Sequence, residues 1–241
     1  MKIINIAQRT PEWHDFRKNG VGASESAAVL GLSKYKTPHN IWEGKTGRSF
    51  PQVVNEYMQH GIDTEDTALE AFININGNNF KPICAEHERY PFIKASFDGV
   101  SENKQSFVEL KCPRSSKLIE KLDSQDVNLI RKEFPDYWCQ VQHQHTVCGA
   151  DVKGYLAAYK DGYLTFLEIP RDDEFIGNDL IPGITEFWHD YVLTDTPPPL
   201  DDKDYVYVDD PKVELKDQEW ICMTELWRRW QLYRWKPYQN D

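Results

Sequence analysis

Two acidic residues and a lysine stand close together near the middle of the sequence. Asp98 is followed, after ten intervening residues, by Glu109-Leu110-Lys111. If residues 107–111 form a strand, Glu109 and Lys111 lie on the same face of it. Asp98 stands at the start of the turn on the neighbouring strand, so a hairpin would bring its carboxylate across from Glu109.

The chemistry of these three groups points to hydrolysis of a phosphodiester. Adjacent carboxylates repel each other unless a cation lies between them, and such hard oxygen ligands favour Mg²⁺ or Mn²⁺. A protonated lysine cannot bind the metal, but it can position a water, deprotonate it, or balance the charge of a pentavalent phosphate. Together these groups suit metal-assisted cleavage of a phosphodiester.

The same spacing also arises from surface charges on an ordinary hairpin. The flanking residues favour the functional interpretation, because Phe107, Val108, Leu110 and Cys112 make this strand apolar and therefore central in a sheet. Charged side chains that project from a buried strand need partners.

Elements on both sides of this hairpin predict an α/β sandwich around a mixed sheet. Strands are expected at 90–95 and 107–111, and a later hairpin at 154–159 and 163–169 turns through Asp161-Gly162. Helices are expected at 22–31, closed by Gly31, at 53–73, interrupted or bent near His60-Gly61, and after Pro135-Asp136.

Composition is that of a globular chain with a real core. Of the 241 residues, 40% are hydrophobic and 13% aromatic, and the net charge is −11. There is neither an apolar run of about 18 residues nor a signal peptide, so we expect no membrane span and a cytoplasmic location. The charge is uneven, because residues 1–50 carry eight basic and four acidic residues. Net acidity therefore does not exclude a nucleic-acid partner.

A proline-rich stretch suggests where the main domain ends. Thr196-Pro197-Pro198-Pro199 is stiff and extended, and an acidic segment follows it. Residues 1–195 are predicted to form the main domain. Residues 196–241 are predicted to be an acidic, Trp-rich C-terminal extension, with a helix at 217–235 suited to packing or to an interface.

Several further motifs occur in an order that is typical of one family. The chain resembles the YqaJ-like phage exonuclease/recombinase family, which includes the lambda exonuclease, within the PD-(D/E)XK nuclease superfamily. The superfamily's proline before the first aspartate is Phe97 here. The resemblance covers residues 7–170 and rests on these motifs: Gln8-Arg9-Thr10 with Trp13-His14-x-x-Arg17; Gly22-Ala23-Ser24-Glu25; Gly31-Leu32-Ser33-x-Tyr35-Lys36-Thr37-Pro38; Gly61-x-x-x-Glu65-x-x-Ala68; Ser96-x-Asp98-Gly99; Glu109-Leu110-Lys111-Cys112-Pro113; and Tyr137-x-x-Gln140-Val141-Gln142.

This resemblance implies a PD-(D/E)XK core with a mixed sheet flanked by helices, and a role for each of several residues. Asp98, Glu109 and the Leu110 carbonyl would hold the catalytic metal, with Lys111 beside the attacking water. Glu65, from a helix before the sheet, would complete the acidic site. Roles at its border are implied for four more residues: Gln140 and Tyr137 beside the site, and Arg17 and Ser24 on the 5′-phosphate of a DNA end.

The implied activity is a Mg²⁺-dependent 5′→3′ exonuclease, with Mn²⁺ able to substitute and one or two ions bound. Its substrate would be linear double-stranded DNA, and the 3′ single-stranded tails would pass to a strand-annealing protein for recombination. A homo-oligomer is implied, and ring-shaped trimers occur in the family.

Other interpretations of the same residues remain. Without the family resemblance, Glu65 could equally belong to the solvated start of a helix, because Asp63 and Asp66 stand beside it. Arg17 could equally be an ordinary surface arginine. His143 and His145 lie two residues apart on a helix, hence on different faces, and are interpreted as core or surface residues rather than metal ligands.

Two alternative functions also remain. A nuclease of the RecB/Cas4 type would need a cysteine cluster for an iron–sulfur centre, yet only Cys222 lies in the last ninety residues. A non-catalytic DNA-end binding or adaptor protein on a nuclease scaffold is disfavoured by the intact acidic residues and lysine.

Overall fold

The computed structural model describes residues 1–49 and 56–204. Its strands form a single sheet of seven in the order β1-β3-β4-β5-β6-β7, with β2 paired to β4 beside that path. None of the described helices is both long and apolar enough to cross a membrane. The strands are β1 (Lys2–Ile4), β2 (Val21–Gly22), β3 (Phe80–Glu86), β4 (Ile93–Ser101), β5 (Ser106–Lys111), β6 (Lys153–Lys160) and β7 (Tyr163–Glu168).

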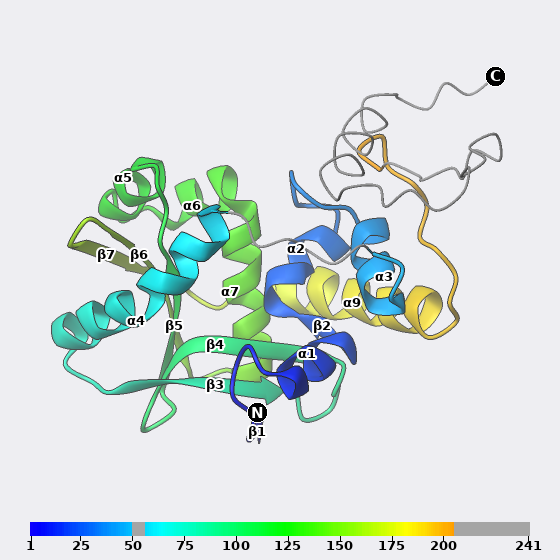
Figure 1. The fold of residues 1–241 in the computed structure, drawn as a ribbon, viewed down its shortest axis with the longest axis horizontal. Coiled ribbons are helices and arrows are strands. Elements are labelled where there is room, and N and C mark those ends of the chain that lie inside the picture. Colours follow the sequence, from blue (N-terminus) through cyan, green and yellow to red (C-terminus); the bar gives the residue numbers. More distant parts are fainter. Residues whose placement is uncertain (50–55, 205–241) are drawn as a thin grey trace, which may run out of the picture. The chain divides into compact units, whose positions relative to one another are not determined.

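Helices cover both faces of this sheet (Figure 1). They are α1 (Pro11–Lys18), the 3₁₀ turn η1 (Ala23–Glu25), α2 (Ser26–Val29), α3 (Pro38–Thr46), α4 (Glu56–Asn76), α5 (Lys117–Asp123), α6 (Val127–Glu133), α7 (Pro135–Cys148), and a continuous helical run of α8 (Asp173–Phe175), η2 (Ile176–Leu180), α9 (Ile181–Glu186) and η3 (Phe187–Val192).

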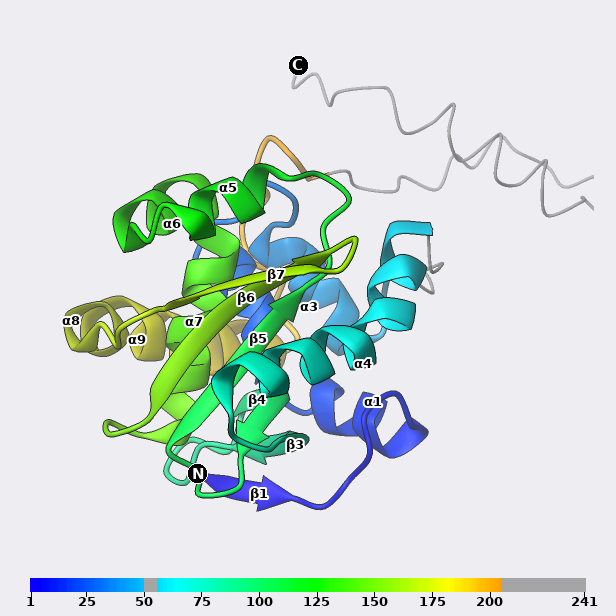
Figure 2. The same cartoon turned by 90° about the vertical axis from the view of Figure 1, so that its left-hand side faces the viewer.

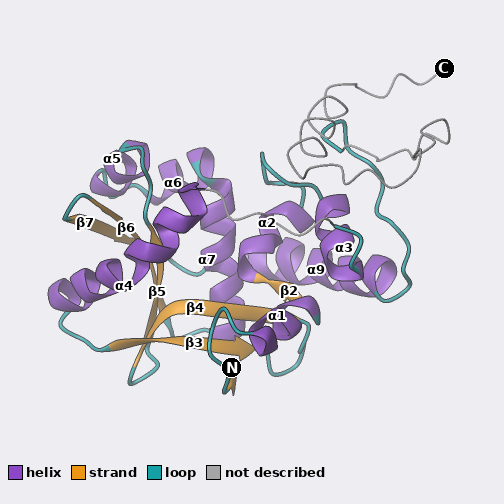
Figure 3. Cartoon of the chain, in the orientation of Figure 1, coloured by secondary structure: helices purple, strands orange, loops and turns teal. Residues whose placement is uncertain are grey.

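The pairing makes the sheet mixed, as the sequence predicts. β5 runs parallel to β6, and β2 runs parallel to β4, whereas the other pairs are antiparallel. The predicted hairpin at 154–169 is confirmed, and helix α7 begins at Pro135 as expected. The first hairpin also forms, but its leading strand continues to Ser101 instead of ending at Ala95, so Asp98 lies inside β4 and not at the start of the turn. Figure 3 shows the strands as one layer among the helices.

Alternation along the central strands separates two apolar cores. Phe107 packs in the larger core with α7, whereas Val108 packs in a smaller core with Ala68 and Phe72 of α4. Helices α4 and α7 therefore lie on opposite faces of the sheet (Figure 2). Because Glu109 follows Phe107 by two residues, its side chain projects toward α7.

The predicted interruption near His60-Gly61 is wrong. Helix α4 continues through both residues to Asn76, although a glycine inside a helix costs about 1 kcal/mol. Packing of fully buried Ala68 and Phe72 on the sheet offsets that cost. The start of the predicted helix, 53–55, lies outside the described residues.

Strand β3 and the run from α8 to η3 are elements that the sequence patterns did not predict. Pro82 lies inside β3, where proline normally argues against a strand, but the register with β4 shifts between Lys81 and Ile83. A bulge of this kind accommodates a residue that has no N–H to donate. In the run, wide π turns precede and follow α9, which has Pro182 in its first turn.

The contacts divide the chain into a compact unit, 1–199, and a second unit, 200–241. The predicted Trp-rich helix at 217–235 lies outside the described residues. Every predicted site residue belongs to the first unit.

Candidate active site

Strands β4 and β5 place the first two carboxylates across from each other. Their ladder pairs Gly99 with Val108, so the next step along it carries Asp98 toward Glu109. At that point the side chain of Asp98 replaces a backbone acceptor, because the Leu110 N–H donates to Asp98 Oδ2 at 2.8 Å. This hydrogen bond fixes the carboxylate against the strand that bears Glu109 and Lys111.

Helix α7 holds the other side of the acidic group. Glu109 is 3% exposed and accepts two hydrogen bonds, from Lys111 Nζ at 2.7 Å and from Gln144 Nε2 at 2.5 Å. Lys111 Nζ also donates to Gln140 Oε1 at 3.1 Å. Gln140 and Gln144 are one turn apart on α7, so one helix face holds both the carboxylate and the ammonium.

Tyr137 borders this group without lining the cavity beside it. The Lys111 ammonium lies 4.8 Å from the centre of the Tyr137 ring, and that ring stacks on Phe134. A cation over an aromatic face is stabilised by the ring's quadrupole. The structure thus places Tyr137 against the lysine.

Glu65 reaches the same cavity from α4. Its Oε2 pairs with Arg9 Nη2 at 2.5 Å, and its side chain is 28% exposed. It makes no hydrogen bond with Asp98 or Glu109, although all three line one cavity. Arg9 therefore supplies the cation nearest to Glu65.

The electrostatics of the acidic group follow from crowding of like charges in a sheltered place. Burial and then the Glu109 carboxylate raise the pKa of Asp98 well above its ordinary value. Burial also raises the pKa of Glu65, with Arg9 opposing and Glu109 reinforcing the shift. Burial acts against the charge of Lys111, but Glu109 and Asp98 outweigh it and raise its pKa. Crowding of the carboxylates thus favours the protonated form of Asp98 and the charged form of Lys111.

These donors fit a hard divalent cation. Asp98 Oδ1 and Glu65 Oε1 make no hydrogen bond with any other residue that the structure describes, and Leu110 lines the same cavity. Among those residues, no three His, Cys, Asp or Glu side chains form a complete metal cage. Mg²⁺ does not require one, because it commonly binds through one or two carboxylates and keeps several waters.

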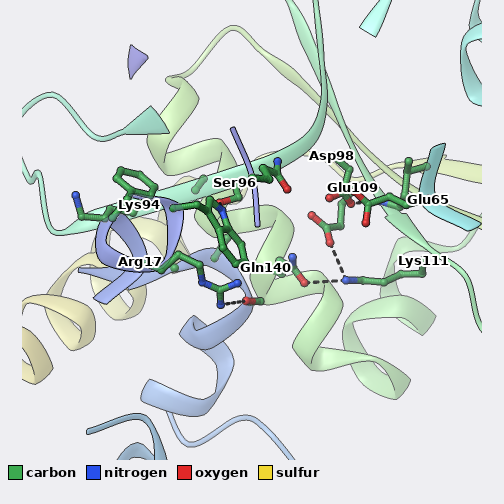
Figure 4. Close-up of a pocket in the computed structure, with 16 residues that line it drawn as sticks. Arg17, Glu65, Lys94, Ser96, Asp98, Glu109, Lys111 and Gln140 are labelled. Atoms are coloured by element: carbon green, nitrogen blue, oxygen red, sulfur yellow. Dashed lines mark hydrogen bonds and ion pairs between the residues drawn. The ribbon is translucent and has the colours of Figure 1, made fainter. Parts of the chain in front are cut away.

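A second group of side chains lies at the other end of the cavity. Arg17, in the last turn of α1, donates from Nη2 to Ser24 Oγ at 3.3 Å, and its guanidinium lies 4.7 Å from the Trp13 ring. Trp13 Nε1 in turn donates to Ser96 Oγ at 2.8 Å. Figure 4 shows Arg17 approaching from the side opposite Lys111 and Glu65.

The two groups share one cavity. Its volume is about 240 Å³, and polar side chains from both groups line it, among them Arg17, Ser24, Glu65, Asp98, Lys111 and Gln140. Of the predicted site residues, Tyr137 is the one that does not line it. The cavity joins an acidic end that suits a cation to a cationic end that suits an anion.

Sequence reasoning assigned no role to several residues that shape this cavity. Gln8 donates to the Phe97 carbonyl at 2.9 Å, and Arg9, Trp13 and Ser96 make the contacts described above. All four belong to quoted motifs, and Ser96 lies two residues before Asp98 on the same strand. Gln144, which donates to Glu109, is another such residue, and its spacing of four residues from Gln140 on one helix is the signal that could have found it.

The two histidines of α7 are core residues, which is one of the two alternatives that the sequence leaves open. His143 Nε2 bonds with the Lys94 carbonyl and His145 Nε2 with the Ile169 carbonyl, each at 2.9 Å. Both side chains are at most 1% exposed. They anchor α7 to the sheet.

Comparison with solved structures identifies the fold. The alkaline exonuclease LHK-Exo from Laribacter hongkongensis superposes with a TM-score of 0.64 and 23% identity, covering 78% of this chain and 94% of that one. LHK-Exo in complex with dAMP gives the same TM-score with 22% identity. The expected PD-(D/E)XK nuclease fold is confirmed.

Comparison of sequences identifies the family. The chain is 33% identical over 203 residues to the uncharacterized protein YqaJ of Bacillus subtilis, covering 82% of this chain and 61% of that protein. It is 27% identical over 198 residues to the uncharacterized protein R354 of Acanthamoeba polyphaga mimivirus, covering 77% and 34%. The chain thus spans less than two thirds of either relative. Residues 12–151 match the YqaJ-like viral recombinase domain, and the chain belongs to that family.

Proposed function

We propose that this protein is a metal-dependent exonuclease that digests one strand of linear double-stranded DNA from its 5′ end. Mg²⁺ is the proposed cofactor, as one or two ions, and Mn²⁺ would substitute for it. Asp98, Glu109, Glu65 and the Leu110 carbonyl would hold the metal, whereas Arg17 and Ser24 would bind the terminal 5′-phosphate.

One observation carries this proposal: a single cavity joins the acidic group to the Arg17–Ser24 pair. A metal site alone does not select a strand polarity, because a scissile phosphodiester carries the same groups in either direction. A guanidinium and a hydroxyl at one end of the cavity supply the missing asymmetry, since they favour a terminal phosphate with its extra negative charge. The acidic end then faces the next phosphodiester along the strand.

The residues divide the work of hydrolysis between them. Arg17 and Ser24 hold the terminal phosphate, and Lys111 balances the negative charge that grows on the scissile phosphate. A divalent ion supplies Lewis acidity and lowers the pKa of a bound water. Gln140 and Gln144 keep Lys111 and Glu109 in place, and Tyr137 lies against the Lys111 ammonium.

The products of this reaction sustain the next cycle. Water adds to the phosphorus, the bond to the 3′ oxygen of the terminal nucleotide breaks, and a 5′-mononucleotide leaves. The shortened strand again begins with a 5′-phosphate, which is the group that the Arg17–Ser24 pair would bind. The complex of LHK-Exo with dAMP, a 5′-mononucleotide, supports this product class.

The biological setting that we propose is recombination by strand annealing. Digestion would leave 3′ single-stranded tails for a single-strand annealing protein. The enzyme would act as a homo-oligomer, with a trimeric ring as the form that encloses DNA, in the cytoplasm of a host cell. The proposed domain division, a nuclease of residues 1–195 and an extension of 196–241, assigns the chemistry to the first part.

Digestion of a linear duplex labelled on each strand in turn tests the proposal. We expect Mg²⁺-dependent release of mononucleotides from 5′ ends, loss of activity with EDTA, and recovery when Mg²⁺ is added back. Release from 3′ ends would contradict the assigned polarity. Binding of duplex ends without cleavage at any Mg²⁺ or Mn²⁺ concentration would instead indicate an end-binding adaptor.

A further inference from the structure

A buried ion pair lies behind the Arg17–Ser24 end of the cavity. Lys45 of α3 has a side chain that is 4% exposed, and its Nζ contacts Glu25 Oε2 at 2.6 Å. Neither residue is assigned a role above. A buried lysine and glutamate persist only when each is well paired, because an unpaired charge is costly to bury.

This pair ties together the elements that carry Arg17 and Ser24. Lys45 Nζ also donates to the Arg17 carbonyl at 2.8 Å, which anchors the end of α1 to α3. Glu25 Oε2 accepts from the Gly22 N–H at 2.7 Å, which fixes the turn that presents Ser24. The fit around Gly22 is close, since a Cβ there would meet Glu25 Oε2 at 3.3 Å.

Glu25 is also a competitor for the Arg17 guanidinium. Its second oxygen, Oε1, lies 3.8 Å from Arg17 Nη2, the same nitrogen that donates to Ser24. Burial disfavours the charged form of Glu25, but Lys45 and then Arg17 outweigh it, so the pKa of the carboxyl lies below its ordinary value. An anionic Glu25 without Lys45 would have Arg17 as its nearest cation.

We propose that Lys45 is a positioning residue that neutralises Glu25 and thereby leaves the Arg17 guanidinium available to an external phosphate. This inference rests on the proposed anion-binding role of Arg17 and Ser24. It makes a distinctive prediction, because most of the harm done by removing Lys45 would come from the uncompensated charge of Glu25 and not from the lost hydrogen bond to the Arg17 carbonyl. Removing both charges should therefore restore most of the phosphate binding that is lost when Lys45 alone is removed.

The test compares two variants with the wild type, using inorganic phosphate as the probe. Lys45→Met deletes the ammonium and keeps an unbranched side chain, and Glu25→Gln/Lys45→Met also removes the competing carboxylate. The side-chain Nε–H resonance of Arg17, assigned with Arg17→Lys, reports binding in an NMR titration. Lys45→Met should weaken phosphate binding by on the order of tenfold, since it compromises a charge-assisted contact. The double variant should bind phosphate within about twofold of the wild type.

A merely structural role for Lys45 predicts a different pattern. The double variant would then bind phosphate as weakly as Lys45→Met, or more weakly, and the proposal would be wrong. Melting temperatures establish that each variant is folded. If Lys45→Met does not fold, Glu25→Gln decides alone: it removes the competitor, so phosphate binding should stay equal or become tighter, and weaker binding overturns the proposal.

Failure of this inference can be told from failure of the proposed function. Phosphate binding needs no cleavage, so the pattern can appear in a protein that digests no DNA, which would refute only the exonuclease. Conversely, a wild type that digests 5′ ends while Lys45→Met keeps full phosphate affinity refutes only the role of Lys45. A wild type whose Arg17 resonance does not respond to phosphate refutes the inference outright.

Discussion

The two ends of the cavity are built in different ways. The acidic end stands on central strands of the sheet, and Glu109 is almost fully buried between β5 and α7. The cationic end stands on a short helix and a 3₁₀ turn close together in sequence, where the Arg17 side chain is 32% exposed and Ser24 is exposed. One end is fixed by strand pairing within the sheet, and the other by a turn that Lys45 holds in place.

This difference matches the division that we propose, with chemistry at the acidic end and recognition at the cationic end. Side chains on central strands are held rigidly, because moving them means breaking ladder hydrogen bonds and a packed core. A turn that is fastened by a few side-chain contacts can be altered at lower cost. Damage at the acidic end should therefore abolish the reaction, whereas damage at the cationic end should change which DNA ends are used.

Removing a charge from the acidic end should have the largest effect. Asp98→Asn and Glu109→Gln each delete a proposed ligand charge at nearly constant volume, and Lys111→Ala deletes the cation beside them. We expect each to reduce cleavage of an end-labelled duplex by about a thousandfold or more. Circular dichroism should show an intact fold, and Lys111→Ala should still bind metal and DNA. Full activity of Glu109→Gln with Mg²⁺ would exclude this site.

Replacing Arg17 should have the next largest effect, and a selective one. Loss of one charge-assisted contact costs about 1.5–3 kcal/mol, or roughly ten- to a hundredfold. Arg17→Ala should slow digestion of 5′-phosphorylated ends by that factor and of 5′-hydroxyl ends little. Steady-state rates on both ends measure the preference. Equal slowing on both would make Arg17 a general backbone contact, and no slowing on either would make it a bystander.

Gln144 offers a smaller change that acts through Glu109. Gln144→Leu removes the hydrogen bond to Glu109 Oε2, and loss of such an indirect support typically lowers metal affinity by about tenfold or more. Mn²⁺ binding without DNA, followed by electron paramagnetic resonance, measures this. Gln142→Leu is the matched control, because Gln142 lies on the same helix but bonds Pro170 and Asp172 instead. Equal losses in both variants would show a general effect on α7.

The smallest expected effect comes from His143, which changes the stability of the whole domain and therefore both ends of the cavity alike. Burial lowers its pKa to about 4 from the ordinary 6.5, so it stays neutral when folded. The unfolded chain takes up the proton first, and stability is lost as pH falls from 6.5 toward 4. Between pH 7 and pH 5 this removes about 2 kcal/mol. His143→Gln keeps a donor for the Lys94 carbonyl and should lose correspondingly less in denaturant melts. An identical pH dependence in both proteins would contradict the assignment.

The sequence predicts the acidic end better than the cationic end. Strand alternation alone places Glu109 and Lys111 on one face and brings Asp98 across from them, because this geometry depends on local periodicity. The family motifs add Arg17 and Ser24. The pairing of Lys45 with Glu25 was not predicted, because the two residues come from different helical elements and no periodic pattern relates them. Their pairing emerges only when α1, η1 and α3 are packed together.

The fold shows the same division between elements that local sequence signals predict and elements that depend on packing. Helix α7 and the two hairpins are marked by Pro135, by Asp161-Gly162 and by alternating apolar residues, all of which are local signals. Strand β3 is hidden by Pro82, which becomes acceptable only because the pairing with β4 shifts there. Helix α4 passes through Gly61 because burial of Phe72 outweighs a local preference.

Helix α7 has a consequence for how such domains can be recombined. It supports the acidic end through Gln140 and Gln144, and its Cys139 Sγ contacts Ser26 Oγ at 3.4 Å, next to the turn that carries Ser24. A chimaera that took its first 49 residues from one relative and its sheet from another would place a foreign turn on this helix. Segments 1–49 and 135–148 should therefore be inherited, and exchanged in the laboratory, as one unit although 85 residues separate them in the sequence.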